Sequence, residues 1–105
     1  MIKVVFEEKG GNLKGFSASG HAGYAPYGSD IVCAAVTSAV QMTVNGAVEI
    51  IKARCKVEAL ENEISFSSEE ESSGVVAMLE ALKLHLEILS EQYEGKIKVE
   101  VITGV

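Results

Sequence analysis

The sequence predicts an α+β domain with a mixed, mainly antiparallel sheet and two long helices. Two observations lead to this fold class. Five short segments alternate apolar and polar residues with a period of two, and two longer segments carry apolar residues at helical spacing. Their order along the chain is strand, strand, helix, strand, strand, helix, strand (β-β-α-β-β-α-β). At 105 residues, the chain is expected to form a single domain over residues 1–105.

The first two strands are expected to form a hairpin. Residues 2–7 place Ile2, Val4 and Phe6 on one face, and residues 13–20 form the returning strand. Between them stands Lys9-Gly10-Gly11-Asn12, and glycine and asparagine accept the positive φ angles that tight hairpin turns need.

A loop is expected over residues 20–28, followed by a helix from Ser29 or Asp30 to about Ala53. The oxygen of Ser29 or Asp30 can cap the first N–H groups of this helix. The helix is apolar nearly all round, and such a helix must be covered nearly all round. We therefore expect a homodimer with this helix at its centre. The alternative is a monomer that wedges the helix between the sheet and the second helix.

The second half of the chain is expected to contain two short strands, a helix and a last strand. Strands are expected over residues 55–60 and 63–67, joined at Glu61-Asn62, and a charged, serine-rich link covers residues 68–73. The second helix is expected over residues 73–93 and the last strand over residues 96–102. One continuous apolar stripe runs along the second helix: Val75, Leu79, Leu82, Leu86, Leu89 and Tyr93.

Composition weighs against several classes of function. The formal net charge of −6 argues against direct nucleic-acid binding, which needs clustered lysine and arginine. No apolar run has the length of a membrane span, and no signal peptide is recognisable, so no membrane partner is expected. Two unmatched cysteines indicate free thiols in a reducing compartment, most simply the cytoplasm. The spacing of cysteine and histidine fits no metal site, no phosphate-binding loop is present, and no cofactor is expected.

The chemistry is concentrated between Gly20 and Ala35. His21 stands at one edge of the loop, and Cys33 stands at the other edge, in the first turn of the predicted helix. The helix N-terminus and a nearby imidazolium both favour a thiolate, which suits nucleophilic catalysis. The alternative for Cys33 is an inert, packed cysteine. Its pairing with a loop histidine favours the catalytic interpretation.

Three further residues of this stretch are candidates for supporting roles. Asp30 can cap the helix, orient His21 or tie the loop shut, and capping is the simplest interpretation. Tyr24 and Tyr27 can form a lid that grips a substrate, or they can anchor the loop to the body of the protein. Outside the stretch, Cys55 is expected to be structural, and His85 is expected to be packed or interfacial.

The runs Gly20-His21-Ala22, Tyr27-Gly28 and Asp30-Ile31-Val32-Cys33-Ala34 resemble the signature of the ribosomal-processing cysteine protease Prp family. The resemblance extends over the whole chain in length and element order. It implies an endopeptidase that removes the N-terminal extension of the large-subunit ribosomal protein L-twenty-seven during ribosome assembly. It further implies His21 and Cys33 as the catalytic pair, Gly20 and Asp30 as supporting residues, a homodimer, and a mobile loop between the pair.

One position departs from the family pattern. The family can carry serine four residues after the cysteine, whereas this chain has Thr37, which keeps a hydroxyl and with it a supporting role. Two alternatives stay open at this point. One is a thiol enzyme of another class, such as an acyl transferase or a redox protein, and the other is a non-catalytic dimeric module that binds a ribosomal protein.

Overall fold

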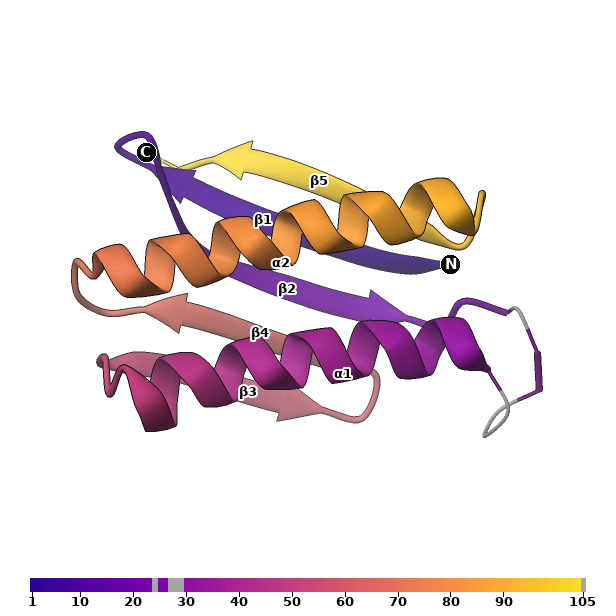
Figure 1. The fold of residues 1–105 in the computed structure, drawn as a ribbon, viewed down its shortest axis with the longest axis horizontal. Coiled ribbons are helices and arrows are strands. Elements are labelled where there is room, and N and C mark those ends of the chain that lie inside the picture. Colours follow the sequence, from indigo (N-terminus) through magenta and orange to yellow (C-terminus); the bar gives the residue numbers. More distant parts are fainter. Residues whose placement is uncertain (24, 27–29, 105) are drawn as a thin grey trace.

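The protein is a five-stranded sheet with two helices on one of its faces (Figure 1). The structure is a computed structural model, and it describes residues 1–23, 25–26 and 30–104. The strand order is β3-β4-β2-β1-β5, and only β1 and β5 pair in parallel. The predicted α+β class and element order are therefore confirmed. The elements are β1 (Ile2–Lys9), β2 (Asn12–Gly20), α1 (Ile31–Asn45), η1 (Gly46–Ile50), β3 (Cys55–Leu60), β4 (Glu63–Ser68), α2 (Ser73–Gln92) and β5 (Ile97–Thr103).

The predicted hairpin is present at the start of the chain. Gly10 and Gly11 both have positive φ angles, 63° and 84°, between β1 and β2. This is the conformation that a tight two-residue hairpin turn requires, and it explains why two glycines stand there.

The core lies between the helices and the covered face of the sheet. Strand register places Phe6, Phe16 and Phe66 side by side on three neighbouring strands, with ring centroids 6.0 and 5.7 Å apart. The predicted stripe of α2 is buried against this layer, with Tyr93 half-buried at its end. The stripe residues that are buried are Val75, Leu79, Leu82, Leu86 and Leu89.

The first helix differs from the prediction in its last part. The α-helix ends at Asn45, and a π-helical turn continues it to Ile50, where the prediction had one helix to about Ala53. Gly46 lies directly against the end of the Met78 side chain on α2, so a side chain at position 46 would require Met78 to move. The N–H of Ile51 donates to the carbonyl of Gly46 at 2.9 Å, the five-residue span of a π-turn. Lys52, with a φ of 60°, then turns the chain toward β3.

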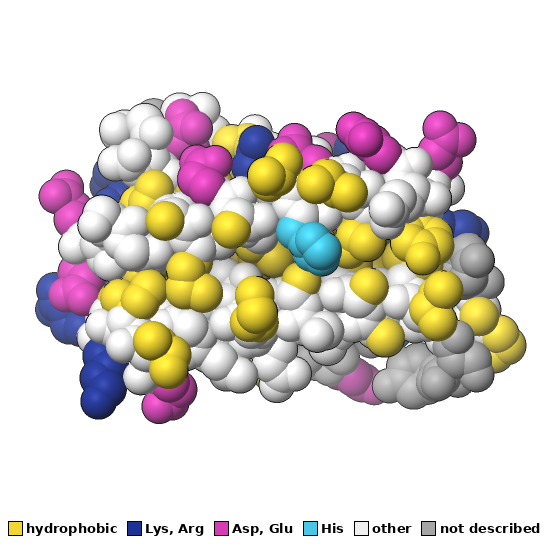
Figure 2. All heavy atoms as spheres, viewed as in Figure 1, with side chains coloured by type: hydrophobic (Ala, Val, Ile, Leu, Met, Phe, Trp, Pro, Cys, Tyr) yellow, Lys and Arg dark blue, Asp and Glu magenta, His cyan; other side chains and the backbone are white. Residues whose placement is uncertain are grey.

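The outward side of α1 and η1 carries exposed apolar side chains among exposed polar ones. Val32, Val36 and Val40 face the core, whereas Met42 and Ile50 are 69% and 81% exposed. Figure 2 shows hydrophobic side chains gathered over both helices on this face of the molecule. By length and composition the segment 31–50 would also suit a membrane span, a test that core helices of folded domains pass as well.

Candidate active site

The candidate site lies where β2 ends beside the start of α1, and its first component is Gly20. This residue has a φ of 88°, and a Cβ there would collide with the carbonyl oxygen of Met1. Only glycine combines the left-handed backbone with this close approach. Gly20 therefore lets the chain leave the sheet and carry His21 and the buried Ala22 toward α1.

Asp30 is the N-cap of α1. Its Oδ1 accepts the N–H groups of Val32 at 2.9 Å and Cys33 at 3.0 Å, and its Oδ2 lies 3.5 Å from the Ala25 nitrogen. The residue is 9% exposed, so these bonds are shielded from water. The carboxylate thus combines two of the roles expected for it, because it caps the helix and ties the preceding loop to it.

Cys33 joins the two segments. Its Sγ accepts the backbone N–H of Ala22 at 3.3 Å, and the side chain is half-buried in the first turn of α1. The sulfur therefore lies within hydrogen-bond distance of the residue that follows His21. An N–H donor and the positive end of the helix dipole both stabilise negative charge on this sulfur.

His21 is exposed, and its ring contacts a segment that the sequence did not point to. The Nε2 atom lies 3.0 Å from Oδ1 of Asn62, in the turn between β3 and β4. Asn62 was predicted only as part of that turn. The contact depends on strand register across 41 residues, and no local sequence pattern carries a signal for it.

Of the remaining candidate residues, the structure describes Thr37 but neither tyrosine of the loop. Thr37 is exposed on α1, one turn after Cys33 and on the same side of the helix. Tyr24 and Tyr27, the predicted substrate-binding residues, lie outside the described residues. Among the residues that the structure does describe, no three histidine, cysteine, aspartate or glutamate side chains gather to hold a metal ion.

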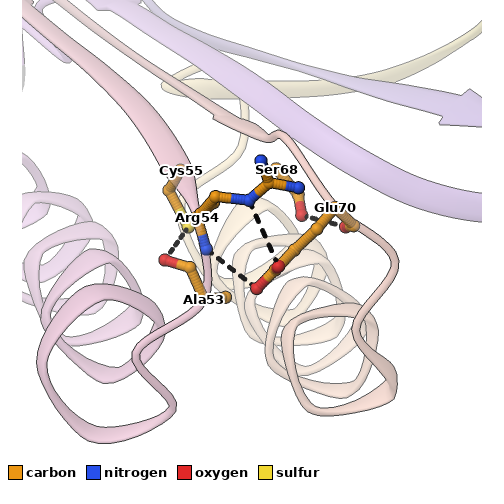
Figure 3. A network of polar contacts seen from close by, with 5 residues as sticks. All are labelled: Ala53, Arg54, Cys55, Ser68 and Glu70. Carbon is orange, nitrogen blue, oxygen red and sulfur yellow. Dashed lines mark hydrogen bonds and ion pairs between the residues drawn. The ribbon is translucent and has the colours of Figure 1, made fainter.

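Cys55 has a different environment, at the start of β3. Its thiol donates to the carbonyl of Ala53 at 3.4 Å. Burial, then the negative charges of Glu70 and Glu69, raise the pKa of this thiol above its ordinary value. Figure 3 shows Glu70 bound to the backbone and side chain of Arg54, the residue before Cys55. The structural role expected for Cys55 stays a prediction.

The model of the cysteine protease Prp family matches residues 1–98. The chain belongs to this family. It is therefore a cysteine protease, which overturns the alternative of a non-catalytic binding module. No curated protein sequence matches the chain significantly.

Solved structures share the fold over nearly the whole chain. The ribosomal processing protease Prp from S. aureus, in complex with a covalently linked product peptide, superposes with a TM-score of 0.92 at 22% identity, covering 97% of this chain and 100% of that one. The same S. aureus protease with a substrate peptide gives 0.81 at 20% identity, with the same coverage. SMU.848 from Streptococcus mutans gives 0.79 at 24% identity, covering 99% of this chain and 96% of that one.

Proposed function

We propose that this protein is a cysteine endopeptidase that removes the N-terminal extension of the ribosomal protein L-twenty-seven precursor in the cytoplasm, with His21 and Cys33 as its catalytic pair. The observation that carries the proposal is the bond from the Ala22 N–H to Cys33 Sγ, which joins the histidine segment to the head of α1. Family membership supports the reaction class, and the S. aureus relative is a ribosomal processing protease.

The reaction follows from the roles that the two side chains can take. His21 accepts the thiol proton, and the Cys33 thiolate attacks the scissile carbonyl carbon. The tetrahedral intermediate collapses to a thioester while His21 gives its proton to the leaving amine. Water then attacks the thioester with His21 as the base, which releases the second product and restores the thiol.

The developing oxyanion needs an N–H donor, and the first turn of α1 has few to offer. Asp30 already accepts the N–H groups of Val32 and Cys33 through its side chain, and that of Ala34 through its carbonyl. The Ala22 N–H, by contrast, points at the reacting sulfur. It is the described donor best placed to stabilise charge that develops next to that atom.

The position of Cys55 does not support the alternative of a redox-active thiol enzyme. Cys55 follows the far end of α1, and that helix alone is about 22 Å long at 1.5 Å per residue. A resolving thiol must lie next to the reactive one.

Cleavage of the precursor tests the proposal directly. The protein is incubated with the ribosomal precursor, and the new N-terminus is identified by mass spectrometry. Cys33→Ala and His21→Ala are each expected to lower kcat by at least about 10³-fold. Cys55→Ala is the matched control and should cleave normally. Undiminished cleavage by the Cys33 variant would overturn the proposal.

The net charge of −6 supports a basic substrate, because an acidic enzyme attracts a basic ribosomal protein over a distance set by ionic strength. Added salt should therefore raise KM for the intact precursor more than KM for a short neutral peptide.

The proposed active form is a homodimer that covers the exposed face of α1, η1 and α2. Leu84 and Ile88 on α2 are 60% and 46% exposed, and Met42 on α1 is 69% exposed. Figure 2 shows hydrophobic side chains over both helices on this face. A groove on the same side is lined by Met42, Ile50 and Met78. Exposed apolar area of this kind marks an interaction surface, and a second copy would bury it most simply in a two-fold pair.

Light scattering tests the dimer. The wild-type chain is expected at twice the mass of one copy, and Met42→Lys combined with Leu84→Lys at the mass of one. Leu60→Lys is the control, since Leu60 is equally exposed but lies on the edge strand β3. A wild-type mass of one copy would contradict the dimer.

A further inference from the structure

The turn between β3 and β4 holds the histidine segment by two separate bonds. The carbonyl of Asn62 accepts the N–H of Gly20 at 3.3 Å, and its side-chain Oδ1 lies 3.0 Å from His21 Nε2. One residue therefore contacts both the backbone before the imidazole and the imidazole itself.

The sheet fixes the place of this turn. Ser19 of β2 pairs with Glu63 of β4, the residue directly after Asn62. The hydroxyl of Ser17 also donates to the Glu63 carboxylate at 2.8 Å. Asn62 is thus carried by a rigid strand pair, which suits a residue that must hold a catalytic side chain in one orientation.

The bond also selects the tautomer of His21. Oδ1 is an acceptor only, so Nε2 must carry the hydrogen and donate it. A neutral imidazole has a single N–H, which leaves Nδ1 without a proton and able to accept one from the thiol. After that transfer the imidazolium keeps its bond to the amide oxygen, whose dipole stabilises the added charge.

We propose that Asn62 is a positioning residue for His21 that completes a Cys-His-Asn arrangement, with Nδ1 as the atom that exchanges protons with Cys33. The inference rests on the proposed role of His21 as the catalytic base. Cysteine, histidine and asparagine form the same functional set in papain-like proteases, on an unrelated fold.

Nuclear magnetic resonance of the imidazole nitrogens tests the tautomer without any cleavage assay. In the wild-type protein, the ring of neutral His21 should be protonated at Nε2. In Asn62→Ala both tautomers should be populated, whereas Glu61→Ala, a change at the neighbouring turn residue, should leave the spectrum as in the wild type. A wild-type His21 protonated at Nδ1, or a spectrum unchanged in Asn62→Ala, would overturn the proposal.

Steady-state kinetics of Asn62 variants provide the second test of the proposal. Asn62→Ala is expected to lower kcat about 10-fold or more, within the 10²–10⁴-fold that a general base supplies, with KM nearly unchanged. In Asn62→Asp, a carboxylate next to Nε2 stabilises the imidazolium, so the acidic limb of kcat/KM should move to higher pH. A turn that acts only as a structural tether would produce no such shift, so an unmoved limb counts against the proposal.

The two arms also separate this proposal from the one on which it rests. Undiminished cleavage by Cys33→Ala would remove the catalytic pair, whereas the tautomer measurement would still show whether Asn62 orients the ring. Should Asn62→Ala lower the thermal stability, Asn62→Asp retains an acceptor in the turn and keeps the pH test available.

Discussion

The two cysteines lie near opposite ends of one helical segment, and the groups that contact their sulfurs have opposite polarity. Cys33, in the first turn of α1, accepts an N–H at its sulfur. Cys55, just after η1 and the turn that follows it, donates its S–H to a carbonyl and has Glu70 and Glu69 nearby. Both side chains are half-buried. Burial alone therefore does not distinguish the proposed nucleophile Cys33 from Cys55, whereas the polarity of the groups around each sulfur does.

Selective alkylation measures this difference directly. At neutral pH, iodoacetamide should modify Cys33 at least about 10-fold faster than Cys55, because only the thiolate reacts. Peptide mapping by mass spectrometry during the reaction gives both rates in one sample. Equal rates would remove the distinction on which the assignment of Cys33 depends.

The cap at the start of α1 should contribute to both stability and activity. Asp30→Ala is expected to lower the free energy of unfolding by about 1 kcal/mol, measured by urea denaturation. Cleavage should also fall, since the same carboxylate contacts Ala25 and Cys33. Ser72→Ala is the matched control, because Ser72 caps α2 through the N–H of Val75. It should cost a similar free energy and leave cleavage unchanged.

The glutamates near Cys55 predict a pH-dependent contribution to stability, and we expect it to be smaller than the effect of removing the Asp30 cap. Its pKa in the folded chain lies above the ordinary value of 9.0, so the stability associated with the neutral thiol is present below that pH and is lost as the pH rises through the raised pKa. Glu70→Gln removes one of the charges responsible and should lower that pKa.

Alkylation of Cys55 followed against pH, in a Cys33→Ala background, measures this change. The Glu70 variant should react at lower pH than its parent, and Glu71→Gln, next in the sequence, is the control. A profile that does not move would assign the whole shift to burial, which is the larger cause.

Local patterns were sufficient to predict the elements, and contacts between distant segments were not predictable from them. The alternation in residues 2–7, the two glycines at 10 and 11, and the stripe of α2 each act within a few residues, and each is confirmed. The packing of Gly46 against Met78 joins residues that lie 32 positions apart in the sequence. The bond between His21 and Asn62 likewise depends on which strands become neighbours. Such contacts are properties of the assembled fold.

The close approach of Met1 to Gly20 has a practical consequence for work with this protein. The amino terminus lies at the same end of the molecule as the segment that follows β2, and the carboxyl terminus lies at the other end (Figure 1). An affinity tag fused ahead of Met1 would emerge next to His21 and compete with a peptide for that space. Purification handles are better placed after β5, at the end of the molecule away from His21 and Cys33.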